Sequence, residues 1–255
     1  MATIDRVMFT VEQRDALRDR VLSLAEKDPR VMAGAAVGSL ALGGGDRLSD
    51  LDLTFAVADG VPVLEVLDDW TRALSYEFAA VPLVDLERGP TTYRVFLLRD
   101  LLQFDLSMTP AARFVPAGPR FRLLFGETAT GVPDNAPRPP VAADLFGWGV
   151  IYALHSRSCI ERGRVWQAEH YIGAVRDHAL SLACLRLGLT AVQARGYDDL
   201  PAEVLAGFSE THVGSHEPER LRGALSAAVE ALLREGSAAK LPSADGVAQR
   251  VSELR

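Results

Sequence analysis

The chain has 255 residues, with 27 lysines and arginines against 34 aspartates and glutamates, which gives a formal net charge of −7. Hydrophobic residues make up 48% of the sequence and charged residues 24%, so the composition excludes a globally disordered chain. The length predicts one large domain or two small ones. The net acidity argues against a bulk nucleic-acid binder, because such proteins usually carry a basic face.

The cysteines and the apolar runs indicate where such a chain would reside. Its two cysteines, Cys159 and Cys184, lie in apolar sequence, so we expect buried free thiols rather than a disulfide framework. No apolar run approaches the roughly 20 residues of a membrane span. Residues 1–27 are charged and amphipathic, without the apolar centre of a signal peptide. We therefore expect a cytoplasmic protein that does not associate with membranes.

The first half of the chain has the pattern of a mixed α/β region. Apolar residues at helical spacing predict helices over residues 11–27 and 63–78. Short apolar or alternating runs predict strands over residues 31–37, 51–57, 92–98 and 101–108, of which the last two form a hairpin. A glycine-rich loop over residues 40–49 separates the first two strands. In this prediction the strands are few and short.

The second half of the chain has a helical pattern and no strand-like run. Residues 128–140 are rich in proline, glycine and asparagine, which predicts a linker. Helices are predicted over residues 142–161, 165–187 and 218–234, with a short helix in the tail. The predicted fold class is therefore α+β. A small mixed sheet with helices occupies residues 1–127, a linker residues 128–140, and an all-α bundle residues 141–255.

A pair of aspartates on the second predicted strand is the first sign of chemistry. Alternate residues of a strand point to the same face, so Asp50 and Asp52 project together. Two adjacent carboxylates repel each other unless a cation lies between them. Mg²⁺ is usually held by one or two carboxylates together with substrate phosphates. The pair predicts a magnesium site, with a solvated strand end as the alternative.

Two further features strengthen the interpretation as a metal site. Gly38 and Ser39 end the preceding strand, where a glycine allows close backbone approach and a serine hydroxyl can bind phosphate; an ordinary turn is the alternative. Asp105 lies between apolar residues of a later strand, and either joins the acidic pair or faces water at a sheet edge. Three carboxylates could hold two Mg²⁺ ions about 3.5–4 Å apart.

This pattern resembles the nucleotidyltransferase superfamily, which shares its fold with DNA polymerase beta. Val37, Gly38 and Ser39 match its hydrophobic-Gly-Ser element, residues 50–53 match its acidic element, and Asp105 fits its third carboxylate. The match covers roughly residues 31–108. In order and composition, and in the run 163–169, the second region resembles the helical domain of small nucleotidyltransferases that modify aminoglycosides and lincosamides.

The resemblance implies a mechanism. Gly38 and Ser39 would hold the phosphates of an NTP, with ATP as the expected one. Asp50 and Asp52 would bind Mg²⁺, and Asp105 would help to hold a second ion. An acceptor hydroxyl would attack the α-phosphorus, and pyrophosphate would leave. Arg47, in the loop before the acids, is predicted either to touch phosphate or to remain a solvated surface residue.

The acceptor side is expected in the helical region. Glu169 and Arg176 share one face of a predicted helix, with the small Gly173 between them. Glu169 is the candidate acceptor-side base, or a partner of a cationic substrate; a solvated residue or a pair with Arg176 is the alternative. Other residues there could form the acceptor site or have structural roles: His155 and His170 as bases, and Trp148, Trp166 and Tyr171 as pocket walls or helix packing.

The resulting hypothesis is a Mg²⁺-dependent nucleotidyltransferase that moves a nucleoside monophosphate from an NTP to a hydroxyl of a small molecule, such as an aminoglycoside-like antibiotic. Its partners would be the NTP and the hydroxylated acceptor, with no nucleic acid and no membrane. Transfer to a protein or tRNA, as in toxin–antitoxin enzymes, and a non-catalytic nucleotide-binding protein of the same fold are the alternatives. Whether Glu169 or Asp105 is the base, and whether the chain is a monomer or homodimer, stays open.

Overall fold

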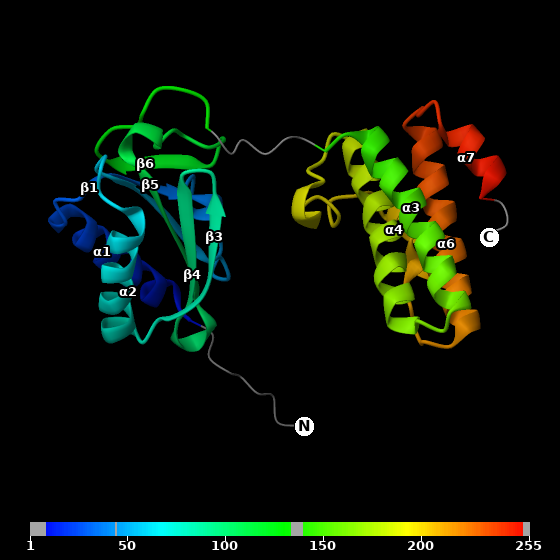
Figure 1. Cartoon of the computed structure of the whole chain (residues 1–255), viewed down its shortest axis with the longest axis horizontal. Coiled ribbons are helices and arrows are strands. Elements are labelled where there is room, and N and C mark those ends of the chain that lie inside the picture. The colour runs from blue at the N-terminus through cyan, green and yellow to red at the C-terminus, as the bar shows by residue number, and fades with distance from the viewer. Residues whose placement is uncertain (1–8, 44, 134–139, 252–255) are drawn as a thin grey trace. The chain divides into compact units, whose positions relative to one another are not determined.

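The computed structural model describes residues 9–43, 45–133 and 140–251, and the chain divides into two compact units, residues 1–137 and 138–255 (Figure 1). The first unit combines a sheet with helices and the second is helical, so the predicted α+β class is confirmed. The predicted linker falls partly on residues 134–139, which lie outside the described residues. The domain boundaries therefore stay a prediction.

The first unit contains a six-stranded mixed sheet in the order β3-β4-β5-β2-β1-β6. Its helices and strands, in chain order, are α1 (Val11–Lys27), β1 (Val31–Val37), β2 (Leu51–Val57), α2 (Val63–Phe78), β3 (Val81–Arg88), β4 (Thr91–Leu97), β5 (Gln103–Pro110) and β6 (Phe121–Phe125). The central strands β2 and β5 are parallel. All other neighbouring strands are antiparallel.

The sequence analysis missed both edge strands, β3 and β6, so the sheet has six strands where four were expected. The strands are short, as expected, with five to eight residues each. Every residue of β3 is exposed, and the strand contains Pro82, a residue that sheets confine to edges. β6 has five residues, none of them buried. The apolar residues of β3 do not alternate regularly, because an irregularity in the register lies between Pro82 and Val84, and β6 is too short for alternation to stand out. The two edges were therefore the hardest part of the sheet to predict.

The two helices of the first unit pack against one face of the sheet and form its core (Figure 1). The main strand residues of this core are Leu51, Leu53, Phe55, Val57, Phe104, Leu106 and Met108. Because side chains alternate along a strand, Asp52 and Asp105 project from the opposite face. We call this opposite face the helix-free face. It carries the candidate site.

The second unit is a bundle built on three long helices. Its helices are α3 (Ala142–Glu161), α4 (Val165–Arg186), α5 (Ala202–Ala206), α6 (Pro218–Ala238) and α7 (Ala244–Arg250). The three long helices confirm the predicted ones, and α6 extends past the predicted end at residue 234. Cys159 and Cys184 are buried free thiols, as expected. Buried Glu235 of α6 accepts a 2.8 Å hydrogen bond from Arg186 of α4, which joins these two helices.

Among the helices that the structure describes, none is long and apolar enough to span a membrane.

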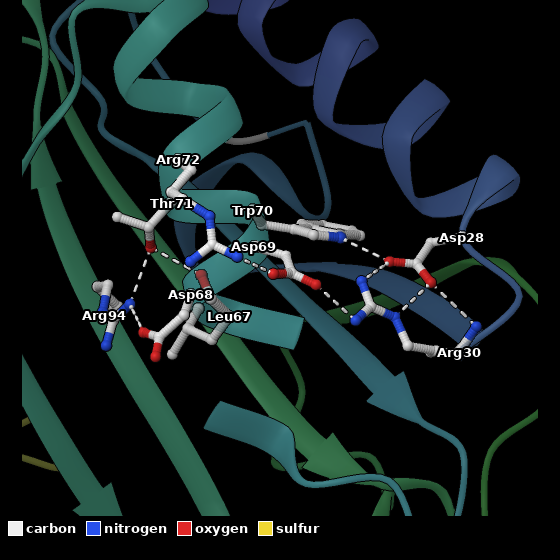
Figure 2. A network of polar contacts seen from close by, with 9 residues as sticks. All are labelled: Asp28, Arg30, Leu67, Asp68, Asp69, Trp70, Thr71, Arg72 and Arg94. Atoms are coloured by element: carbon white, nitrogen blue, oxygen red, sulfur yellow. Dashed lines mark hydrogen bonds and ion pairs between the residues drawn. The ribbon is translucent and has the colours of Figure 1, made fainter. Parts of the chain in front are cut away.

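A chain of ion pairs holds α2 against the rest of the first unit (Figure 2). Asp28, which follows α1, accepts hydrogen bonds from Arg30 and from Trp70 Nε1 of α2 at 2.8 and 3.0 Å. Arg30 also donates to Asp69 of α2 at 2.6 Å. On the far side of α2, Arg94 of β4 donates to Asp68 at 2.7 Å. These contacts fix α2 between the α1–β1 turn and strand β4.

The hydrogen bonds from Arg30 outweigh burial and, with the bond from Trp70, lower the pKa of Asp28 to about 2. The ordinary value is 3.8, so the ionised form is favoured in the folded state. This stabilisation is fully present above about pH 4. It is lost as the pH falls from 3.8 toward 2, because both the folded and the unfolded states then become protonated.

We predict that Asp28→Asn lowers the free energy of unfolding by about 1–2 kcal/mol at pH 7, because it removes the paired charge. The difference from wild type should shrink as the pH falls below about 4. Urea unfolding measured from pH 7 to pH 2.5 would show both effects. The control Asp15→Asn removes an exposed pair with Arg18 and should cost less than about 0.5 kcal/mol. A pH-independent cost for Asp28→Asn would contradict the account.

Candidate active site

Three carboxylates meet at the start of the parallel strands β2 and β5. Asp50 directly precedes β2, Asp52 is its second residue, and Asp105 is the third residue of β5. The parallel register pairs Asp52 with Asp105. Carboxylate oxygens of all three residues lie within 4.8 Å of one another. In the part of the chain that the structure describes, no other His, Cys, Asp or Glu cluster has metal-binding geometry.

The cluster is unfavourable when all its members are ionised. Burial raises the pKa of Asp105, and the nearby charge of Asp50 raises it further. Gln103 partly opposes this, because its Nε2 donates a 2.9 Å hydrogen bond to Asp105 Oδ1. A cation among the three groups would relieve both the repulsion and the cost of burying charge. The set of oxygen ligands fits Mg²⁺, a hard cation.

The turn after β1 lies directly against this cluster. Gly38 has a φ of +71°, and a Cβ at this position would overlap Asp52 Oδ2. The position therefore requires glycine for both its backbone conformation and its close approach. The next residue, Ser39, has a buried hydroxyl without a hydrogen-bond partner among the described residues. A buried hydroxyl beside a cation site fits a phosphate oxygen, which would satisfy its unmade hydrogen bond.

Arg14 holds the loop that leads into the acids, and the sequence analysis missed this role. This arginine of α1 is 4% exposed and donates from Nη1 to the carbonyl oxygens of Asp46 and Ser49, at 2.7 and 2.9 Å. The Asp46 carboxylate in turn accepts from the Leu48 amide at 2.8 Å. The sequence did contain a signal for this role, because Arg14 precedes Leu17 and Val21 on the buried stripe of α1. A charged residue that faces the core indicates that it has a buried polar partner.

The predicted first-unit site residues fall into two groups. Five residues lie together at the ends of β1, β2 and β5: Gly38, Ser39, Asp50, Asp52 and Asp105. Arg47 lies in the loop before Asp50 and is exposed. Its contact with phosphate therefore stays a prediction.

Glu169 belongs to the helical unit, where its partner differs from the expected one. Glu169 Oε2 lies 2.7 Å from Nε2 of His216, a residue the sequence analysis did not single out. Arg176 contacts His212 Nδ1 at 3.4 Å and Asp177 at 3.5 Å. The expected alternative, a pair between Glu169 and Arg176, was therefore wrong.

The surroundings of Glu169 form a cavity of about 470 Å³, which includes Trp166, Gly173 and His212 in its lining. Gly173 leaves space there, as expected, since a Cβ at this position would meet only Arg176, at 3.6 Å. Trp166 is 74% exposed and Trp148 52%. Neither tryptophan is a core residue, although the Trp166 ring packs edge-on against His216, with 4.1 Å between the ring centroids.

No family model and no curated protein matches the sequence. Among solved structures, the chain is similar to one described as an aminoglycoside 6-adenyltransferase from Bacillus subtilis, with 12% identity and a TM-score of 0.42 over 97% of this chain and 99% of the other. It is also similar to a nucleotidyltransferase-like protein from Exiguobacterium sibiricum, with 16% identity and a TM-score of 0.35 over 88% and 77%. With TM-scores below 0.5, neither likeness assigns a fold family or an activity to this chain.

We predict that Asp105→Asn leaves the apo protein as stable as wild type or more stable, because it removes one of three mutually repelling charges. Mg²⁺ should raise the melting temperature of wild type, since a ligand that binds only the folded state stabilises it. It should have little effect on Asp105→Asn. Thermal melts in EDTA and in roughly 10 mM Mg²⁺ would measure both effects.

The matched control is Glu65→Gln, which removes an exposed charge from the first turn of α2. Its response to Mg²⁺ should equal that of wild type. A large fall in the melting temperature of Asp105→Asn in EDTA would instead identify Asp105 as a structural residue.

Proposed function

We propose that this chain is a Mg²⁺-dependent nucleotidyltransferase that transfers a nucleoside monophosphate from an NTP, with ATP as the first candidate, to a hydroxyl of a small molecule. One observation carries the proposal: three carboxylates converge beside a glycine–serine turn whose serine hydroxyl is buried and without a described partner. The turn supplies donors for phosphate and the cluster supplies ligands for its counter-ion. ATP and Mg²⁺ are cytoplasmic reactants, which agrees with the expected location.

The residues of the first unit then have separate roles. Asp50, Asp52 and Asp105 hold one or two Mg²⁺ ions, and Ser39 donates to a phosphate oxygen. Bound there, Mg²⁺ would neutralise phosphate charge and lower the pKa of the acceptor hydroxyl. The acceptor oxygen forms a bond to the α-phosphorus while the bond to the β-phosphate oxygen breaks, and pyrophosphate leaves. Arg47, an exposed residue of the preceding loop, is proposed to contact a phosphate oxygen.

Glu169 is proposed as the group that takes the proton of the acceptor hydroxyl. Its side chain is 41% exposed, lines the 470 Å³ cavity and is held at 2.7 Å by His216. A carboxylate that is both oriented and accessible can act as a general base. Asp105 is the other candidate, because its carboxylate belongs to the cluster beside the proposed phosphate site.

A pyrophosphate-release assay tests the proposal directly. We expect release from one of the four NTPs, dependent on both Mg²⁺ and a hydroxylated acceptor, with an aminoglycoside among the first acceptors tried. Asp50→Asn should abolish release while leaving the circular dichroism spectrum unchanged. Glu65→Gln should behave as wild type. NTP binding without any release, across a broad acceptor set, would contradict transferase activity.

We predict that Glu169→Gln lowers kcat for transfer by about 10²–10⁴-fold, the usual contribution of a positioned general base. The KM for ATP should stay within about twofold, because the proposed nucleotide site lies in the first unit. Glu161→Gln, on an exposed position of α3, is the control. Near-normal kcat for Glu169→Gln would move the base role to Asp105 or to a histidine.

A further inference from the structure

The helix-free face continues from the carboxylate cluster onto β4 and β3 as an apolar surface. In antiparallel strands, directly paired residues point to the same face. Val95 of β4 is paired with Asp105 of β5, and Val84 of β3 is paired with Val95. Leu86 and Tyr93 form the next pair along the same face. We call Val84, Leu86, Tyr93 and Val95 the apolar platform.

The platform is open to solvent. Val84 is 47% exposed and Leu86 is 44% exposed, although both are large aliphatic residues. Tyr93 and Val95 are half-buried. Neighbouring strands lie about 4.8 Å apart, so the platform begins one strand spacing from Asp105 and ends about 10 Å away. A small molecule with two or three rings has this length. If it lay along the platform, a hydroxyl at its end would reach the carboxylates.

The charges of β3 are separated between its two faces. Asp85 and Glu87 alternate with the platform residues, so they lie on the face that carries the helices, where Asp85 pairs with Arg94 at 2.6 Å. Arg88 lies on the platform side, with its guanidinium 5.6 Å from the centre of the Tyr93 ring. On its platform side, β3 therefore presents apolar groups next to the cluster and one cation, Arg88, four residues further along the strand from Val84. Its carboxylates lie on the other face.

We propose that the apolar platform binds the acceptor of the transfer reaction, and that the acceptor is an alcohol whose reacting hydroxyl is attached to an apolar, ring-containing body without multiple positive charges. This inference rests on the proposed function and specifies its substrate class. Val95, next to Asp105, would contact the body close to the hydroxyl, and Val84 and Leu86 would contact its far end. The carboxylates next to Val95 are assigned to Mg²⁺, and the platform itself is apolar, so this surface offers a polycation no further carboxylate.

The test compares acceptors of the two chemistries in the pyrophosphate-release assay. Chloramphenicol and 2-naphthaleneethanol represent alcohols with an apolar, ring-containing body, and kanamycin and neomycin represent polycations. We expect a higher kcat/KM with an apolar-bodied alcohol than with either polycation. The double variant Val84→Gln/Leu86→Gln should raise the KM for that alcohol about tenfold, through lost apolar contact. Its KM for ATP should not change.

The matched control is Leu64→Gln, which alters a residue of α2 with a similar exposure, 46%. It should change neither KM. Because all three substituted residues are exposed, circular dichroism should show that every variant folds.

Three outcomes would overturn the inference, and they can be told apart. Higher kcat/KM with the polycations, or an unchanged KM in the double variant, overturns the platform assignment alone. Mg²⁺-dependent ATP binding without transfer to any of the four alcohols overturns the acceptor assignment and leaves the nucleotide site standing. Absence of both ATP binding and release overturns the proposed function, and this inference with it.

Discussion

The convergence of three carboxylates at one end of a parallel strand pair is the constraint on which the rest of the site depends. Each pair of like charges at this separation repels by roughly 1–3 kcal/mol, for effective dielectric constants between those of water and a protein surface. The parallel register that sets Asp52 beside Asp105 is fixed by the buried residues on the opposite face, and cannot slip by one residue without exposing them. The core thus supplies the free energy that holds the acids together.

Other parts of the first unit support this arrangement. Gly38 allows the turn after β1 to approach Asp52 without a steric clash. Arg14 ties the following loop to α1 through two carbonyl oxygens, and so limits where Asp50 can lie. The ion pairs of Asp28 and Arg94 fix α2 over the core (Figure 2). The site is therefore preorganised by backbone geometry and buried polar contacts.

The main helices and the acidic residues of the site could be predicted from the sequence, because the patterns that indicate them lie within short stretches of the chain. Alternation around Asp50 and Asp52 predicted a strand with both acids on one face, and helical spacing predicted α1, α2 and the three long helices of the second unit. Asp105 was predicted as a third ligand because an acid between apolar neighbours is costly to bury alone.

Features that depend on distant contacts were missed. The apolar residues of β3 follow no regular alternation, because its register shifts between Pro82 and Val84, and β6 has only five residues. The contact between Glu169 and His216 joins residues 47 positions apart, and no spacing rule indicates it. The apolar platform could not be foreseen either, because it exists only once β3 pairs with β4 in a particular register.

The central claim is that Asp50, Asp52 and Asp105 together form a divalent-cation site that serves a bound nucleotide. A crystal structure of the protein grown with Mn²⁺ and a non-hydrolysable ATP analogue tests it most directly, because Mn²⁺ gives an anomalous signal. The account predicts an anomalous peak within about 2.5 Å of oxygens from at least two of the three carboxylates, the bond length of a hard cation to oxygen, with the triphosphate against Ser39. A triphosphate bound elsewhere, or Mn²⁺ absent from the three aspartates, would contradict it.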